Sequence, residues 1–184
     1  IPTMTTQKRL SFEFFPPKTE VGAEKLKVVR TELAKLHPEF FSVTYGAGGS
    51  TRDNTLNIVE AMKSEGLSVA PHLSFGGDDE TSMLGLLKKY QALGVNRIVA
   101  LRGDMPSGMG GSYQMVYANE LVAFIREHFA DQFHLEVAAY PEIHPESESF
   151  ESDIHFLKEK FLAGANSAIT QYFFNIDAYY YYIE

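Results

Sequence analysis

Hydrophobic and polar positions along the chain follow two alternating patterns. Short runs rich in β-branched and aromatic residues, bounded by Gly, Pro and Asn, are typical of buried strands. Six such runs occur, at residues 10–15, 40–45, 68–73, 97–101, 135–140 and 168–174. Between them, apolar residues recur at the spacing of an amphipathic helix. The pattern therefore predicts a repeated strand–helix unit.

The helical segments also carry signals for their faces and ends. Two sets of apolar residues step by three or four positions and so share a helix face: Leu26, Val29, Leu33 and Leu36, then Phe150, Ile154, Leu157 and Phe161. Asp53 and Asp78 are at positions expected for N-caps. Gly66, Gly94 and Gly164 are where a left-handed residue is expected to end a helix.

Alternating strands and helices favour parallel βαβ units. No predicted strand is followed by a G-x-G-x-x-G turn, so an open dinucleotide-binding sheet lacks its main support. We predict an α/β fold of the (β/α)8 TIM barrel type, with about six of the eight units, because a full barrel needs about 250 residues. Residues 1–184 are expected to form a single catalytic barrel domain, truncated at its C-terminus, and the natural protein is expected to continue past Glu184.

Composition removes several classes of function. The 184 residues include 16 Lys and Arg against 24 Asp and Glu, a formal charge of −8, which argues against nucleic-acid partners. The absence of cysteine excludes disulfides, thiolate metal sites, iron–sulfur ligation and cysteine nucleophiles. No apolar run approaches the roughly 18 residues that span a bilayer, and the first residues lack a secretory pattern. We expect a cytoplasmic protein without membrane partners.

Six polar residues share one point of the repeat, within or just after the end of a strand. They are Glu13, Thr44, His72, Asp104, Tyr140 and Gln171, separated by 28 to 36 residues, or one strand–helix unit each. In a barrel these positions form a ring at the C-terminal mouth, where barrel active sites are built. The spacing therefore predicts a pocket at that mouth.

Each candidate also has a structural interpretation. Glu13 lies among three phenylalanines and is either a solvated outward carboxylate or an acid whose pKa is raised by apolar neighbours. Asp104 follows Gly103 and is either a turn residue or part of the site. For His72 after Pro71, a structural histidine is the commoner interpretation.

His144, with Glu142 and Glu146, has the residue types of a metal site. No second histidine lies one helical turn away, however, and Pro141 and Pro145 indicate a rigid loop rather than a helix. We therefore expect no metal there.

Eight short motifs, spread over nearly the whole chain, occur in the same order as in a known protein family. They are SFEFFPP (11–17), SVTYGA (42–47), APHL (70–73), ALRGD (100–104), AAYPE (138–142), HPE (144–146), GAN (164–166) and ITQYFF (169–174). With these motifs the sequence closely resembles the methylenetetrahydrofolate reductases of the bacterial single-domain type.

The resemblance implies a flavoprotein oxidoreductase of one-carbon metabolism that acts on CH–NH donors. Its barrel would bind FAD without a covalent bond, and NADH or NADPH would be the co-substrate. Hydride would pass by a ping-pong route from the nicotinamide dinucleotide through FAD to 5,10-methylenetetrahydrofolate. The product, 5-methyltetrahydrofolate, would serve methionine biosynthesis. The family also suggests a homo-oligomer.

The resemblance also implies roles for individual residues. Glu13 would be the general acid that opens the imidazolidine ring of the folate, and Asp104 would contact flavin and folate and tune both half-reactions. Gln171 would bind the pterin ring, and Lys160 and Arg102 would bind the pyrophosphate. The positions that would line the FAD site are Thr44, His72, Arg102, Gly103, Asp104, Tyr117, Ala118, Tyr140, His144, Asp153 and Lys160.

Two other interpretations stay open. One is a barrel enzyme without flavin, in which Glu13 and Asp104 form an acid–base pair acting on a small metabolite. The other is an inactive barrel fragment whose pocket is incomplete. Flavin content separates the first from a folate reductase, and restoring the missing C-terminal strands tests the second.

Overall fold

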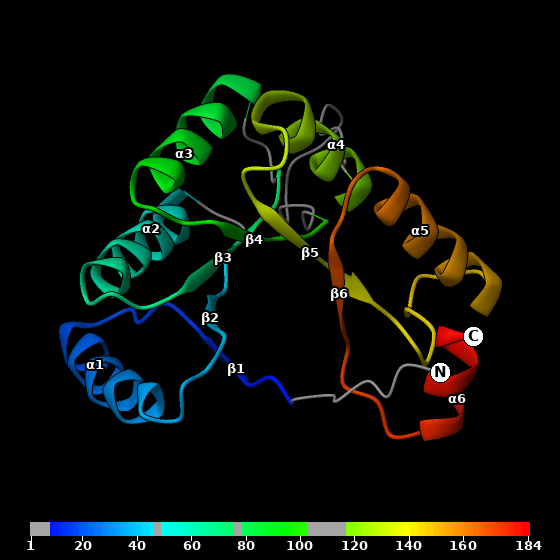
Figure 1. Ribbon diagram of the computed structural model, residues 1–184, viewed down its shortest axis with the longest axis horizontal. Helices are drawn as coiled ribbons and strands as arrows, with labels where there is room; N and C mark the ends of the chain where they lie inside the picture. The colour runs from blue at the N-terminus through cyan, green and yellow to red at the C-terminus, as the bar shows by residue number, and fades with distance from the viewer. Residues whose placement is uncertain (1–7, 46–48, 76–78, 103–116) are drawn as a thin grey trace, which may run out of the picture. The chain divides into compact units, whose positions relative to one another are not determined.

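The computed structural model describes residues 8–45, 49–75, 79–102 and 117–184. Over these ranges strands and helices alternate strictly, from β1 to α6 (Figure 1). Every strand pair is parallel, and each strand pairs with the next strand along the chain. The predicted α/β repeat is therefore confirmed, whereas the total of eight units stays a prediction.

The elements lie close to the positions predicted from the sequence. The strands are β1 (Ser11–Phe14), β2 (Phe40–Val43), β3 (Val69–Leu73), β4 (Arg97–Ala100), β5 (His134–Ala139) and β6 (Ser167–Thr170). The helices are α1 (Glu20–Ala34), α2 (Gly49–Ser64), α3 (Glu80–Ala92), α4 (Ala118–Phe129), α5 (Phe150–Leu162) and α6 (Ile176–Ile183). None of the helices in the described ranges is long and apolar enough to cross a bilayer.

The chain divides into two compact units, one ending at Pro71 and the other running from His72 to Glu184. Strand β3 contributes to both. Its residues 69–71 pair with β2, and its last two residues pair with β4. The expectation of one domain over residues 1–184 stays a prediction.

In the first unit, the side chains of β1 alternate between the two faces of the sheet. Phe12 and Phe14 stack on Phe41 of β2, with ring centroids 5.9 and 5.4 Å apart. Glu13, between them, is paired in register with Ser42. The aromatic face therefore turns away from the carboxylate.

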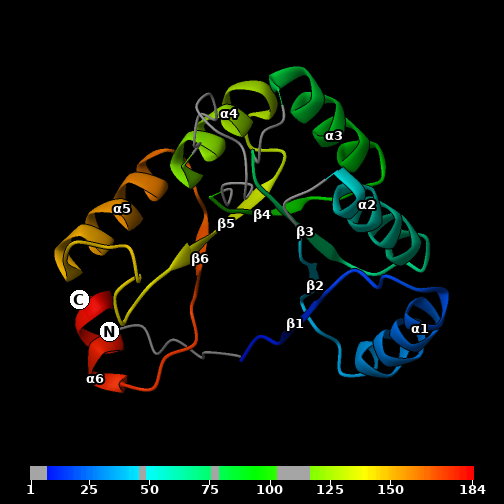
Figure 2. The same ribbon diagram turned by 180° about the vertical axis from the view of Figure 1, so that it is seen from behind.

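In the second unit, one face of strands β4 and β5 is apolar. Ile98 and Ala100 of β4 pair with Leu135 and Val137 of β5, and all four are inaccessible to solvent. Helices α3, α4 and α5 lie along the same side of these strands, as both views show (Figures 1 and 2). Because the helices cover this face, polar groups are concentrated at the strand ends and on the opposite face.

The predicted helix ends are mostly confirmed. Gly66, Gly94 and Gly164 follow α2, α3 and α5 with φ values of 78°, 81° and 118°, the left-handed backbone that favours glycine. The predicted N-cap at Asp53 is wrong, because α2 begins a full turn earlier, at Gly49. Asp78 lies outside the described residues. The N-cap of α3 is the next residue, Asp79, whose carboxylate accepts a hydrogen bond from Ser82 N at 2.7 Å.

Strand β6 is shorter than the run at 168–174 predicted. Gln171 N still donates to Ala139 O at 2.8 Å, but the chain then leaves the sheet. The backbone N–H groups of Phe174 and Asn175 donate to the Glu142 carboxylate at 3.1 and 2.6 Å. This side-chain acceptor replaces the strand ladder and starts the loop into α6.

Candidate functional site

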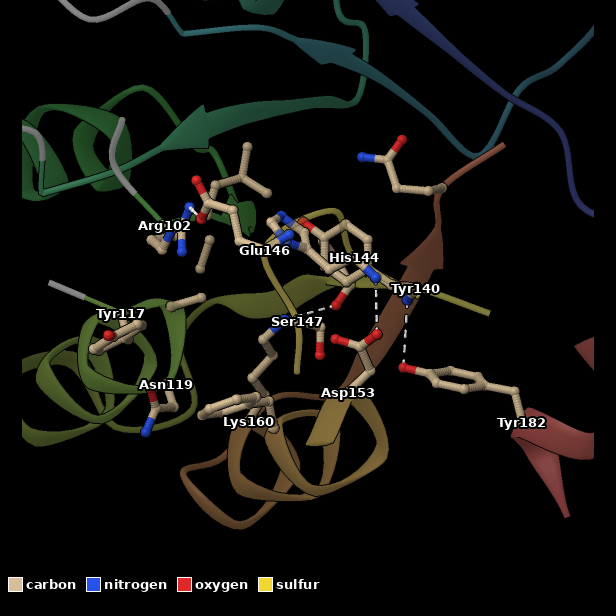
Figure 3. Close-up of a pocket in the computed structure, with 16 residues that line it drawn as sticks. Arg102, Tyr117, Asn119, Tyr140, His144, Glu146, Ser147, Asp153, Lys160 and Tyr182 are labelled. Carbon is tan, nitrogen blue, oxygen red and sulfur yellow. Dashed lines mark hydrogen bonds and ion pairs between the residues drawn. The ribbon is translucent and has the colours of Figure 1, made fainter. Parts of the chain in front are cut away.

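A cavity of about 320 Å³ lies at the carboxyl ends of the strands of the second unit (Figure 3). Its wall combines residues after β4, β5 and β6 with the start of α4 and with side chains from α5 and α6. This volume is at the lower end of the range for ligand pockets, about 300–1,000 Å³. Parallel strands bind ligands at this end.

The cavity contains a desolvated ammonium group. Lys160 Nζ, from α5, donates to Ala138 O at 2.8 Å and lies 5.5 Å from the centroid of the Tyr140 ring. Burial lowers the pKa of Lys160 below its usual value; nearby Asp153 opposes this shift and Arg102 adds to it. An anion bound beside Lys160 would relieve the cost of this half-buried charge.

A second cation, Arg102, lies just after β4. Its guanidinium Nη2 donates to the carboxylate of Glu146 in the β5–α5 loop. This hydrogen bond raises the pKa of Arg102 and lowers the pKa of Glu146. The Arg102 side chain is 31% exposed and that of Glu146 is 66% exposed, so the pair lies at the solvent side of the cavity.

The first turn of α4 adds a third positive feature. Tyr117 is the N-cap, and its backbone N–H donates to the Glu120 carboxylate at 2.7 Å. Ala118, the first helical residue, is buried and lines the cavity. The N–H groups of a first helical turn lack intrahelical acceptors and carry a partial positive charge, which makes them suited to bind phosphate.

The β5–α5 loop is held in one conformation by its own polar groups. His144 N donates to the buried carboxylate of Asp153 at 2.8 Å, and Glu146 N donates to His144 Nδ1 at 3.1 Å. Because Nδ1 accepts, the neutral imidazole carries its proton on Nε2. The imidazole also packs edge-on against Tyr140, with centroids 4.6 Å apart.

Helix α6 contributes a residue that the sequence did not single out as part of a site. Tyr182 is buried, lines the cavity and accepts a hydrogen bond from Tyr140 N through its hydroxyl at 3.3 Å. Burial raises the pKa of this phenol. In the sequence, Tyr182 belongs to a run of four tyrosines that indicates only a packed helix face, so no local signal distinguishes it from its neighbours.

Most residues predicted for the site lie around this one cavity. Those that line it are Arg102, Tyr117, Ala118, Tyr140, His144, Asp153, Lys160 and Gln171. Gly103 and Asp104 lie outside the described residues. His72 is buried in β3 and does not line the cavity, whereas Glu13 and Thr44 belong to the first unit.

The two predicted residues of the first unit have different surroundings. Glu13 is exposed and its carboxylate accepts from Ser42 Oγ at 3.3 Å, so the apolar setting expected for it does not come from Phe12 and Phe14. Thr44 follows β2, and its N–H donates to Phe14 O of β1 at 2.9 Å while its carbonyl accepts from Thr55 Oγ1 of α2 at 2.9 Å.

The acidic residues around His144 are each used differently. Glu142 accepts backbone N–H groups that precede α6, whereas Glu146 pairs with Arg102. In the described part of the chain, no group of three or more His, Asp or Glu residues is arranged to hold a metal ion.

Comparison with known sequences decides the family. The family model for methylenetetrahydrofolate reductase matches residues 2–184. The chain belongs to the methylenetetrahydrofolate reductase family. The resemblance carried by the eight motifs is thereby confirmed.

Curated relatives agree over nearly all of the chain. The 5,10-methylenetetrahydrofolate reductase of Escherichia coli is 44% identical over 174 residues, which are 94% of this chain and 57% of that protein. The enzyme of the same name from Buchnera aphidicola of Schizaphis graminum is 47% identical over 171 residues, 92% of this chain and 57% of that protein. Methylenetetrahydrofolate reductase (NADH) 1 of Arabidopsis thaliana is 37% identical, over 94% of this chain and 32% of that protein. The chain thus spans little more than half the length of its bacterial relatives.

Solved structures support the fold alone. A 2,3-dimethylmalate lyase of the PEP mutase/isocitrate lyase superfamily matches 95% of this chain and 61% of its own, with a TM-score of 0.61 at 9% identity. An oxaloacetate acetylhydrolase matches 98% of this chain and 64% of its own, with a TM-score of 0.61 at 10% identity. At such low identity, the likeness indicates shared parallel β/α architecture and no shared chemistry.

Proposed function

We propose that this chain is the flavin-binding part of an enzyme that reduces 5,10-methylenetetrahydrofolate to 5-methyltetrahydrofolate. NADH or NADPH would be the reductant and FAD the carrier of hydride between the two substrates. The observation that carries the proposal is the gathering of seven predicted cofactor positions around one cavity in a chain of this family.

The chemistry of the cavity fits a dinucleotide cofactor. A pyrophosphate carries two negative charges, and the cavity offers Arg102, Lys160 and the amino end of α4 at Ala118. Lys160 is desolvated, so an incoming phosphate would meet an ammonium that water screens poorly. The donor set therefore matches the charged middle of FAD.

Around this group we assign the following roles to the protein. Arg102 and Lys160 hold the pyrophosphate, and His144, whose Nε2 carries the proton, donates a hydrogen bond to the cofactor. Asp153 fixes the backbone of His144 and so orients that donor. Gln171, at the end of β6, binds the pterin ring of the folate. Bound FAD would supply the redox centre that accepts and returns hydride.

Glu13 and Asp104 are the proposed catalytic residues. Glu13 would protonate the folate amine nitrogen as its ring opens, which generates the electrophilic cation that accepts hydride. Asp104 would stabilise that cation by its negative charge. This role of Asp104 is proposed from the family motif ALRGD at 100–104.

The visible absorption spectrum of the purified protein tests the proposed function. We expect flavin bands in the protein as isolated or after addition of FAD, and we expect NADH or NADPH to bleach them under anaerobic conditions. A protein that takes up no flavin would contradict the proposal and would favour a barrel enzyme without flavin or an inactive fragment.

The role of Glu13 is tested by separating the two half-reactions. In Glu13→Gln, flavin binding and bleaching by the nicotinamide dinucleotide should persist, whereas reoxidation by 5,10-methylenetetrahydrofolate should fall by about 10² or more. Equal loss in both half-reactions would contradict the assignment of Glu13 as the general acid.

A further inference from the structure

The cavity contains two carboxylates that are bonded in different ways. Asp153 is 6% exposed and accepts the backbone N–H of His144, which makes it part of the wall. Glu146 is exposed, and its carboxylate accepts from Arg102 across the solvent side of the cavity. Glu146 therefore uses the same guanidinium that a phosphate would use.

The pair between Glu146 and Arg102 is weak enough to exchange. An ion pair with one partner as exposed as Glu146 contributes little net free energy, because water screens it and both side chains lose freedom. A pyrophosphate would form charge-assisted hydrogen bonds with Arg102 and Lys160 together. A ligand with two charged groups therefore outcompetes the single carboxylate.

Exchange would need only a side-chain rotation. The backbone of Glu146 is held where it is, because its N–H donates to His144 Nδ1 at 3.1 Å. The next residue, Ser147, donates its N–H to His144 O at 2.9 Å. The loop can thus keep its conformation while the carboxylate leaves Arg102 and turns into solvent.

We propose that Glu146 is an exchangeable counter-ion of the cavity that competes with phosphate-bearing ligands for Arg102. Its carboxylate occupies Arg102 before a ligand binds and gives way to a phosphate oxygen when the ligand binds. Glu146 therefore lowers the affinity for ligands that need Arg102 and not for an uncharged ligand, and a pyrophosphate offsets this loss through its second contact, with Lys160. This inference rests on the proposed function, because the pyrophosphate it concerns is that of FAD.

The experiment compares three ligands in the wild type and two single variants, followed by a double-mutant cycle. The wild type, Glu146→Gln and Glu148→Gln are titrated with FAD and with riboflavin by flavin fluorescence, and with inorganic pyrophosphate by calorimetry. Glu148 is the matched control, since it is exposed on the same loop and does not line the cavity. Riboflavin has no phosphate and reports any change in the cavity that is unrelated to charge.

We expect Glu146→Gln to bind FAD and pyrophosphate about 2- to 5-fold more tightly than the wild type, with riboflavin unchanged. Glu148→Gln should bind all three ligands as the wild type does. In a double-mutant cycle with Arg102→Gln, the gain from Glu146→Gln should vanish, because no guanidinium is left to release.

Three results would overturn the inference. They are equal affinity of wild type and Glu146→Gln for pyrophosphate, a parallel gain for riboflavin, and a gain that persists without Arg102. Failure of the proposed function has a different signature. If no flavin binds but Glu146→Gln still strengthens pyrophosphate binding, the proposed function is wrong while the counter-ion role stands. If neither flavin nor pyrophosphate binds to any variant, both are wrong.

Discussion

Arg102 and Arg126 are near opposite ends of the strands of the second unit, and their hydrogen bonds differ in kind. Arg102 donates to a single exposed carboxylate, that of Glu146. Arg126 of α4 donates four hydrogen bonds of 2.6–2.9 Å, to the carbonyls of Gly164, Ala130 and Phe133 and to Asn166 Oδ1. Burial lowers the pKa of Arg126, whereas the bond to Glu146 raises that of Arg102.

The difference separates a structural arginine from one available to a ligand. The carbonyls that Arg126 binds precede β5 and β6, so this one side chain joins α4 to the entries of two strands. Asn166 also accepts from Leu135 N at 2.8 Å, which extends the same network. Gly164 and Asn166 of the GAN motif therefore stabilise the fold at the amino ends of the strands, whereas the cavity lies at their carboxyl ends.

The largest expected effect comes from removing the structural arginine. Arg126→Met leaves the carbonyls of Gly164, Ala130 and Phe133 without this donor and leaves Asn166 Oδ1 with Leu135 N alone, so the free energy of unfolding should fall by about 2–4 kcal/mol. Arg102→Met should change it by less than about 1 kcal/mol. Urea denaturation of both variants measures the two values. Similar losses of unfolding free energy in the two variants would mean that Arg102 is as structural as Arg126.

The glycine that contacts Arg126 gives a sharper test of the same region. In Gly164→Ala the new Cβ would lie 2.8 Å from Arg126 Cγ at a φ of +118°, so we expect a loss of about 2–3 kcal/mol. Gly66→Ala has the strained φ of +78° but nothing within 4 Å of the new Cβ, and should lose about 1 kcal/mol. The excess for Gly164 measures the crowding against Arg126 together with the greater backbone strain at its larger φ.

A third glycine, Gly85, provides a control in which alanine should raise rather than lower the free energy of unfolding. Gly85 lies inside α3, where an added Cβ would meet nothing within 4 Å. Gly85→Ala should therefore stabilise the fold by about 0.5–1 kcal/mol through helix propensity. A loss in Gly85→Ala similar to that in Gly66→Ala would mean that positive φ is not the cause of the cost at Gly66.

The first unit contains an arginine that, like Arg102, pairs with one carboxylate but is buried. Arg30 of α1, whose side chain is 5% exposed, donates through Nε to Glu65 Oε2 at 2.9 Å and through Nη2 to the other carboxylate oxygen. The bond to Arg30 lowers the pKa of Glu65 below its ordinary value of 4.5. The pair therefore contributes stability above about pH 4.5, and this contribution is lost as the pH falls through the pKa of the folded state.

We expect Glu65→Gln to lower the free energy of unfolding by about 1–2 kcal/mol at pH 7, with the difference from wild type shrinking toward pH 3. Denaturation across this pH range measures it. The control is Glu32→Gln. The side chains of Glu32 and its partner Lys35 are both more than 60% exposed, so this substitution should change the free energy of unfolding by less than about 0.5 kcal/mol. A constant difference between pH 7 and pH 3 would contradict the assignment to the ionised pair.

Much of the fold could be predicted because its signals are local. Runs of β-branched and aromatic residues located all six strands, and glycine located three helix ends, since a left-handed residue is needed there. The start of α2 was missed because short polar residues such as Ser50 and Thr51 precede Asp53 and offer equivalent starts. The early end of β6 was missed because it depends on Glu142, about thirty residues away in the sequence.

The site was predictable only where a residue type marks its chemistry. Arg102 and His144 belong to motifs that follow strands, and Lys160 was expected only through the family resemblance; the structure puts all three around one cavity. Glu146 was considered only as a metal ligand and Tyr182 only as a packed helix residue, because their roles follow from pairing with Arg102 and with the backbone of Tyr140. Such roles depend on tertiary geometry rather than on sequence pattern.

The smallest expected change in stability belongs to Lys160, and it completes the contrast with Arg126. Burial already disfavours the charged form of Lys160, and its Nζ donates to Ala138 O, so Lys160→Met should alter the free energy of unfolding by no more than about 0.5 kcal/mol. The same substitution should weaken FAD binding about tenfold, because it removes a cation that the pyrophosphate would contact. Lys158→Met, on the exposed side of α5 and outside the cavity lining, should change neither quantity. A Lys160→Met protein as destabilised as Arg126→Met, with FAD affinity intact, would make Lys160 a structural residue and remove it from the proposed cofactor site.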